Sequence, residues 1–328
     1  MHIPNTVLDP RVAGATAVLA VAGLAYGLRT LEKRLGERTT VLMGTTAAFV
    51  FAAQMVNFPV GPGVSGHLLG GVLAAVLLGP WAGAVVIAAV LIVQCLLFGD
   101  GGLTALGANF VNMGLIGSVG GYAIYAPIRR AVGGRVGVVF GATVAAWLSV
   151  ILASGAFAVE IASLGDRAWF YRVLNLMALV HAAIGVGEAV VTGLVVRFVL
   201  QTRPDLIYDP TAEQSPTSPS GRAAGWLQVG AAGLGVALAV GIFLAPFASE
   251  HPDGLEFVGT RVGFLPDASP PSVPVLIPDY QLPGLDRVSL RGATAAAGAV
   301  GTLVVFVVAV AVAKVAARGG RGRAPDAA

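Results

Sequence analysis

The chain has few charged residues for its length. Only 11% of its 328 residues are Asp, Glu, Lys or Arg, whereas 56% are hydrophobic and the mean hydropathy is +0.83. A soluble domain carries roughly 25% charged residues, so this sequence cannot cover a water-facing surface. The scarcity of charge excludes a soluble globular protein and indicates an integral membrane protein, in which apolar stretches of about 20 residues span the bilayer.

Cysteine and lysine are scarce as well. Cys95 is the only cysteine, which excludes an internal disulfide, and the apolar run around it favours a buried, inert thiol. Neither of the two lysines, Lys33 and Lys314, belongs to a Gly-Lys-Ser/Thr phosphate loop, so the chain does not bind ATP in that way. The net charge of +3 is too small to indicate a nucleic-acid partner.

Motifs of several common enzyme classes are absent. The sequence contains no His-Glu-x-x-His pair, no Gly-x-Ser-x-Gly turn and no Cys-x-x-Cys. The first residues also lack the basic start of a signal peptide, and the first apolar run begins only at Val12. We expect the N-terminus to remain on the mature protein. Since His2 is bulky, we also expect Met1 to be retained with a free amine.

Apolar segments and basic loops together predict the membrane topology. Four basic stretches, at 29–38, 129–135, 197–222 and 314–323, hold 14 of the 20 Lys and Arg residues and should lie on the cytoplasmic side. Placing all four inside requires a break in the long apolar run at Gly79-Pro80. The pattern then predicts an all-α membrane protein of nine helices, with the N-terminus outside and the C-terminus cytoplasmic. The predicted helices are 12–28, 40–57, 67–79, 81–98, 103–126, 136–159, 170–197, 224–247 and 292–313.

Two changes in composition divide the chain. Residues 201–222 are rich in Pro, Ser and Thr, which is typical of a cytoplasmic linker, and residues 248–291 form a proline-rich external loop. The sequence therefore predicts a seven-helix membrane domain (1–200), the linker (201–222), a module of two helices joined by the external loop (223–315) and a cytoplasmic tail (316–328).

The N-terminus itself has the donors of a metal chelate. The free amine of Met1, the backbone nitrogen of His2 and its imidazole can close one five-membered and one six-membered ring around one ion. Planar nitrogen sites suit Ni(II) and Cu(II), and deprotonating a backbone amide argues against Mg and Ca. The topology places His67 on the same side as a possible fourth ligand. The alternative is a frayed terminal histidine and a His67 that only caps a helix.

Other polar residues in apolar surroundings are weaker candidates. Those that could orient a histidine ring are Asn57, Ser65, Asn109 and Asn112. His181 and Glu188 lie seven apart on one predicted helix face, either as a polar relay or second metal site or, as we favour, as groups that pin helix packing. The external segment 251–256 could collect cations, but a turn with solvated charges is the default interpretation.

Several motifs resemble the CbiM/NikM family, the substrate-capture components of energy-coupling factor transporters for cobalt and nickel. They are Met-His-Ile-Pro at the start, Gln54-Met55-Val56-Asn57-Phe58-Pro59, Ser65-Gly66-His67-Leu68-Leu69-Gly70-Gly71, Gly107-Ala108-Asn109 with Asn112-Met113-Gly114, and the segment 181–189. Together they cover about residues 1–208. The region 224–315, with Pro-Asp-Gly-Leu-Glu at 252–256, resembles the small CbiN/NikN-type (PDGLE) accessory component.

The resemblance implies a seven-helix capture bundle that holds Ni(II) or Co(II) through Met1, His2 and His67. It also implies ATP-driven uptake at the plasma membrane with partner subunits, namely a transmembrane coupling protein (T component) and two ATPases. One departure is visible, because the family often continues Met-His-Ile-Pro with Asp-Gly where this chain has Asn5-Thr6. The alternatives are a self-sufficient nickel or cobalt channel or carrier, a membrane enzyme, and a metal sensor. The sequence does not choose between nickel and cobalt.

Overall fold

Helices make up most of the computed structural model, which describes residues 2–32, 36–210, 223–265, 275–285, 287 and 289–321. The α-helices of this part are α1 (Pro10–Glu32), α2 (Glu37–Gln54), α3 (Gly71–Leu78), α4 (Pro80–Val93), α5 (Leu106–Asn109), α6 (Gly121–Val132), α7 (Gly134–Glu160), α8 (Arg167–Thr202), α9 (Ala223–Ala239), α10 (Gly254–Val262) and α11 (Leu290–Arg321). Within this part, strands β1 (Phe58–Gly61) and β2 (Val64–Gly66) form one antiparallel hairpin.

Short helical segments of other types extend or connect these helices. The π-helical segments are η1 (Gln94–Phe98), η2 (Phe110–Gly120) and η5 (Val240–Leu244). The 3-10 turns are η3 (Ala162–Leu164), η4 (Pro204–Leu206), η6 (Ala245–Phe247) and η7 (Pro278–Tyr280). Turns of π-helix are rare in proteins and are often found at functional sites. The segment η1, which follows α4, is therefore a candidate part of a functional site.

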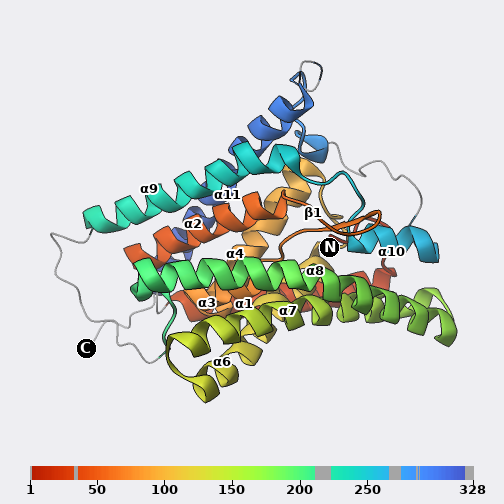
Figure 1. The fold of residues 1–328 in the computed structure, drawn as a ribbon, viewed down its shortest axis with the longest axis horizontal. Coiled ribbons are helices and arrows are strands. Elements are labelled where there is room, and N and C mark those ends of the chain that lie inside the picture. The colour runs from red at the N-terminus through yellow and green to blue at the C-terminus, as the bar shows by residue number, and fades with distance from the viewer. Residues whose placement is uncertain are drawn as a thin grey trace.

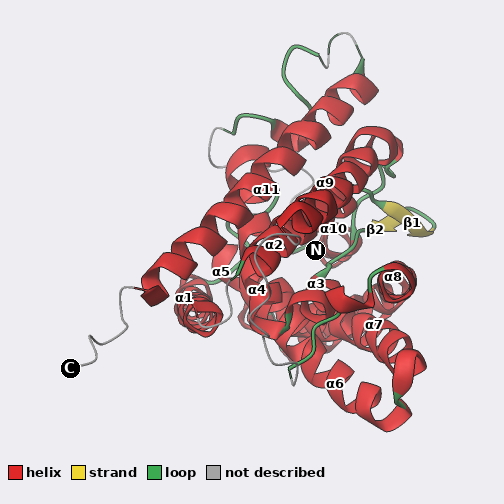
Figure 2. Ribbon diagram, turned by 90° about the vertical axis from the view of Figure 1, so that its left-hand side faces the viewer, coloured by secondary structure: helices red, strands yellow, loops and turns green. Residues whose placement is uncertain are grey.

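Helix α4 lies at the centre of the bundle. It packs against α1, α2, α3, α11 and η2, while α7 and α8 form a long pair along one side (Figure 1). Helices α9 and α11 both pack against α2, so the C-terminal helices join the bundle (Figures 1 and 2). The N-terminus lies beside α10 and the hairpin.

The break at Gly79-Pro80 produces the short helix α3. Gly79 has a φ of +90°, a conformation that L side chains rarely adopt, and Pro80 is the first residue of α4. A Cβ at position 79 would lie 2.8 Å from the ring of Tyr208, which leaves no room for a side chain. All residues of α3 except Leu77 are buried. The eight-residue helix is therefore shielded by protein, as a segment too short to span a bilayer requires.

Helix α8 shows how the molecule faces lipid. Val186, Val190, Leu194 and Phe198 recur every four residues and are 53% to 64% exposed. The buried side of the same helix contains Glu188 instead. An exposed apolar stripe of this length is costly in water and favourable against lipid tails. Six helices of the described residues are long and apolar enough to cross a membrane: 10–32, 80–98, 134–164, 167–202, 225–247 and 290–318.

The predicted all-α, multi-pass membrane class is confirmed. Each predicted segment contains helix, but the segments 40–57, 67–79 and 103–126 correspond to α2, to short α3 and to the path α5–η2–α6. The number of crossings and their orientation stay predictions. The linker and the external loop contain unexpected order, because η4 and the backbone contact from Tyr208 N to Val76 O (2.9 Å) precede residue 210, and α10 lies in the loop. Residues 211–222 and 322–328 of the predicted linker and tail lie outside the described residues.

Candidate metal centre

Two histidines far apart in the sequence meet near the N-terminus. The rings of His2 and His67 are stacked, with their centroids 5.2 Å apart and an interplanar angle of 20°. Each side chain is only 6% exposed. The third predicted ligand, Met1, lies outside the described residues. The structure therefore brings together the two predicted imidazole ligands in a buried position.

The N-terminal segment is held in place through the backbone of Ile3. The amide nitrogen of Ile3 donates to Asn109 Oδ1 (2.8 Å), and its carbonyl accepts from Asn109 Nδ2 (3.2 Å) and from the amide of Gly102 (2.8 Å). The Ile3 side chain is fully buried. Asn109 thus fixes the residue after His2. That it orients a histidine ring stays a prediction.

The departure at Asn5-Thr6 has a structural counterpart. Asn5 Oδ1 accepts from the backbone and the hydroxyl of Thr104, at 3.1 and 3.0 Å. Thr6 has a φ of +71°, in the left-handed region that favours glycine and disfavours a β-branched residue. The segment therefore keeps the turn that a glycine would allow, at the cost of backbone strain at Thr6.

A chain of amide hydrogen bonds determines the tautomer of His2. The carbonyl of Leu69 can only accept, so it binds Gln54 Nε2 (2.9 Å); Gln54 Oε1 then accepts from Gln94 Nε2 (2.8 Å). Gln94 Oε1 is left as the acceptor for His2 Nε2, at 3.1 Å. In the neutral ring the proton therefore resides on Nε2, and Nδ1 carries the lone pair.

His67 is oriented by the opposite ring nitrogen. Its Nδ1 lies 2.9 Å from the carbonyl oxygen of Leu68, which can only accept; when Nδ1 carries the proton of the neutral ring, the lone pair is on Nε2. The next two backbone nitrogens, of Leu69 and Gly70, donate to the carboxylate of Glu188 at 2.5 and 2.9 Å. Glu188 is fully buried and fixes the loop that presents His67.

A carboxylate lies near the other nitrogen of each ring. Asp100 Oδ1 lies 3.2 Å from His2 Nδ1, and Asp253 Oδ2 lies 3.6 Å from His67 Nε2. Asp100 Oδ2 also accepts from the hydroxyl of Tyr280 at 2.6 Å. Burial lowers the pKa of His2 to about 4, although Asp100 acts in the opposite direction, so this imidazole is neutral at physiological pH.

This arrangement has the chemistry of a site for a nitrogen-binding cation. Neutral imidazole is the form that binds metal, and a six-membered ring closed through the backbone nitrogen of His2 requires Nδ1, the atom that the amide chain leaves with its lone pair. Among the described residues, no group of three His, Cys, Asp or Glu side chains is placed to hold an ion. The candidate donors are thus the ring nitrogens of His2 and His67 with the backbone nitrogen of His2.

The remaining predicted residues, Asn57, Ser65 and Asn112, have hydrogen-bond partners of their own. Ser65 Oγ donates to the carbonyl of His251 (2.7 Å), and the carbonyl of Asn57 accepts from the backbone of Ser249 (2.8 Å). Asn112 Nδ2 donates to Glu160 at 2.9 Å.

His181 and Glu188 are both buried in α8, but each has its own partner. His181 Nδ1 bonds the carbonyl of Met177 (2.9 Å), and Glu188 bonds the loop after His67. No relay between them is shown.

Four residues of this centre were not predicted from the sequence: Gln54, Gln94, Asp100 and Tyr280. Gln54 and Gln94 lie in long apolar stretches and are 5% and 0% exposed. A polar side chain inside a membrane segment is costly unless it is paired, so glutamine in an apolar run was the available signal. Asp100 and Tyr280 carry no such local signal, because their contact joins residues far apart in the chain.

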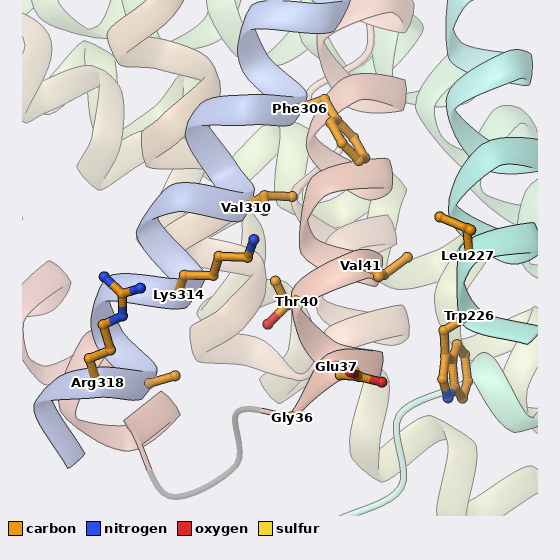
Figure 3. Close-up of a pocket in the computed structure, with 11 residues that line it drawn as sticks. Gly36, Glu37, Thr40, Val41, Trp226, Leu227, Phe306, Val310, Lys314 and Arg318 are labelled. Carbon is orange, nitrogen blue, oxygen red and sulfur yellow. The ribbon is translucent and has the colours of Figure 1, made fainter. Parts of the chain in front are cut away.

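A groove elsewhere in the molecule has different chemistry from the histidine centre. It has a volume of about 590 Å³ and lies between the first turns of α2 and α9 and the C-terminal half of α11 (Figure 3). Its lining is largely apolar, includes the charged residues Glu37, Lys314 and Arg318, and contains no histidine. It is therefore not the site of a nitrogen-binding cation.

Comparisons with known proteins agree with this geometry. The fold and the buried histidine pair define a multi-pass membrane protein with a candidate metal centre at its N-terminus. Residues 2–206 match the CbiM family, described as the cobalt uptake substrate-specific transmembrane region, and residues 227–318 match the PDGLE domain. The chain belongs to the CbiM family, with a PDGLE domain behind it. The resemblance inferred from the sequence motifs is thereby confirmed.

Relatives share this two-part organisation. The chain is 37% identical over 310 residues to a protein of Archaeoglobus fulgidus named "Putative fused nickel transport protein NikMN", covering 93% of this chain and 96% of that one. It is 34% identical to the fused nickel transport protein NikMN of Rhodobacter capsulatus, with 70% of each chain covered. A solved structure of a truncated transition metal transporter is 31% identical, with a TM-score of 0.56, covering 61% of this chain and 99% of that one. Nickel and cobalt are the transported substrates of this family.

The amide chain leads to a first testable prediction. Replacing Gln94 by Leu removes the acceptor for His2 Nε2, so the ring is no longer held in the tautomer with the lone pair on Nδ1. We expect Gln94→Leu to weaken Ni(II) binding by roughly 10- to 100-fold, as is typical for partners that orient metal ligands. Calorimetric titration of the purified full chain measures this. Ser154→Ala, which removes a buried hydroxyl bonded only within α7, is the control and should bind as the wild type does.

The pKa of His2 gives a second prediction. A free imidazole binds a proton below about pH 6.5, whereas buried His2 does so only near its pKa of about 4. The difference between the two pKa values therefore favours docking of the N-terminal segment fully above about pH 6.5. As the pH falls toward 4, protonation of the free imidazole disfavours docking by up to about 1.4 kcal/mol per pH unit. Proton release from the chelating amine acts in the same direction. Ni(II) affinity should fall between pH 8 and pH 5; equal affinity at both would contradict this.

Proposed function

We propose that this chain is the substrate-capture component of an energy-coupling factor transporter that takes up Ni(II) or Co(II). The observation that carries the proposal is the stacking of the His2 and His67 rings, with centroids 5.2 Å apart, in a buried position beside the N-terminus. The ion would be bound by one nitrogen of each ring, the backbone nitrogen of His2 and the amine of Met1.

The donor set supports a late first-row transition metal. Two imidazoles, one amide nitrogen and one amine form a nitrogen-only site, which suits Ni(II) and Co(II) and not Mg(II) or Ca(II), whose preferred ligands are oxygens. The names of the relatives, which include nickel transport proteins and cobalt transport proteins, support the same pair of metals. Both metals accept these donors, so the proposal covers both.

The energy for uptake would come from other chains. The sequence contains no Gly-Lys-Ser/Thr phosphate loop, so a transmembrane coupling protein (T component) and two ATPase subunits would drive release into the cell. The distribution of Lys and Arg supports an external N-terminus and cytoplasmic C-terminus in the plasma membrane. In this view residues 1–200 capture the ion, 201–222 link, 223–315 form the accessory module and 316–328 are the tail.

A third prediction tests the chelate at its most sensitive point. One Ala residue placed before Met1 moves the free amine away from the backbone nitrogen of His2 and leaves every side chain intact. We expect this extension to abolish high-affinity Ni(II) and Co(II) binding, because the five-membered ring can no longer close. The measurement is titration followed by the absorption bands of each ion. The same residue added after Ala328 is the control; normal binding by the N-terminally extended protein would refute the chelate.

A fourth prediction separates the transporter from its alternatives. Vesicles containing this chain with the coupling protein and the ATPases should accumulate radioactive nickel or cobalt in the presence of ATP. Vesicles containing the chain alone should bind the ion without accumulating it. Accumulation by the chain alone would favour a self-sufficient channel or carrier, and binding without accumulation in the complete system would favour a sensor.

A further inference from the structure

The groove between α2, α9 and α11 lies where the CbiM region meets the PDGLE region. Its floor is formed by the first turns of α2 and its walls by α9 and α11 (Figure 3). Both walls approach α2 closely, because a Cβ at Gly44 would lie 2.6 Å from Val310 Cγ2 and a Cβ at Gly230 would lie 2.9 Å from Val41 Cγ1. The groove's volume of about 590 Å³ lies within the range of roughly 300–1,000 Å³ that is typical of small-molecule sites.

Most of the groove's lining is apolar. The apolar side chains come from all three helices: Val41, Leu227, Phe306, Val310 and Ala317. Leu227 is 75% exposed and Phe306 is partly exposed, so the apolar lining opens at the surface of the molecule. A continuous apolar surface of this kind on a membrane protein suits a hydrocarbon chain and not a polar solute.

The charged side chains of the groove do not balance. Lys314 and Arg318 are positive and Glu37 is negative, which gives the lining a net charge of +1. The amino group of Lys314 lies in the space between α11 and α2, whereas Glu37 is directed toward α9 (Figure 3). Lys314 and Arg318 form no ion pair or hydrogen bond with another residue that the structure describes. One negative charge beside Lys314 would therefore neutralise the lining.

Trp226 indicates that this end of the groove lies at a membrane–water boundary. Its ring centroid lies 5.7 Å from the guanidinium carbon of Arg38 and 5.4 Å from that of Arg203. Tryptophan is enriched at such boundaries, and the basic stretches 29–38 and 314–323 are predicted to be cytoplasmic. The cytoplasmic leaflet carries anionic lipids, whose headgroups bind in basic pockets between membrane helices.

We propose that the groove binds one anionic phospholipid, with a hydrocarbon chain along the apolar lining and the phosphate beside Lys314 and Arg318. The single negative charge of a phosphodiester balances the net charge of the lining, which a zwitterionic lipid does not. Because the floor of the groove belongs to the CbiM region and its walls to the PDGLE region, the lipid contacts both. Lipid binding and the packing of the two regions then strengthen each other by the same factor, as thermodynamic linkage requires.

The test is native mass spectrometry of the full chain titrated with phosphatidylglycerol, phosphatidylcholine or glycerol phosphate. The wild type should retain one phosphatidylglycerol, less phosphatidylcholine and no glycerol phosphate. Lys314→Gln should bind phosphatidylglycerol roughly 5-fold more weakly, as one cation near a membrane surface contributes. Lys314→Arg keeps the charge and should bind as the wild type does. Arg130→Gln, the control, removes an exposed cation of α6 that lies outside the groove and should also leave binding unchanged.

A second variant tests the apolar part of the groove. Ala317→Phe fills the groove with a ring and leaves every charge in place, so it should also weaken retention of phosphatidylglycerol. The unfolding midpoint measured without added lipid checks that each variant is folded.

Three results would overturn the inference. Equal retention of the two lipids, or wild-type retention in both Lys314→Gln and Ala317→Phe, would show a lipid-facing surface without a headgroup site. Retention of glycerol phosphate as strong as that of phosphatidylglycerol would show a site for free phosphate. Retention of neither lipid would leave the groove to an apolar segment of a partner protein.

Discussion

The centre depends on which nitrogen of each imidazole keeps its lone pair. A neutral histidine has one donor and one acceptor, so a fixed acceptor at one ring nitrogen determines the other. This chain provides the amide oxygen of Gln94 for His2 and the carbonyl of Leu68 for His67. Both arrangements lead to one loop, because the amide chain ends on the carbonyl of Leu69, whose backbone nitrogen binds Glu188. Helices α2 and α8 and the π-helical segment η1 thus act together to orient the two imidazole rings.

The apolar environment makes this control possible and also limits it. Polar groups at membrane depth are costly unless they are paired, so a chain of two glutamines and a buried glutamate persists only if each bond is made. Helix α8 has two different sides: its exposed apolar stripe is suited to lipid contact, and its buried Glu188 binds the loop that follows His67. The burial that neutralises His2 has the same origin.

Hydropathy and loop charge predicted where helices form, because an apolar run that crosses a membrane must satisfy its backbone hydrogen bonds internally, and an α-helix does so within one segment. His2 and His67 were placed on one side of the membrane by the same reasoning, and the structure brings their rings together. The partners of those rings could not be predicted, since Gln94, Asp100 and Tyr280 join segments that only tertiary packing brings together. For α10, Asp253 and Glu256 have capping-box spacing, a local helix signal, but the neighbouring proline and glycine favoured a turn.

The most direct test of the account is an X-ray absorption spectrum of the full chain loaded with one equivalent of Ni(II). The account predicts a first shell dominated by nitrogen, with the outer-shell scattering of two imidazoles, and the loss of one imidazole contribution in His67→Ala. A shell of oxygen ligands without imidazole scattering would contradict it.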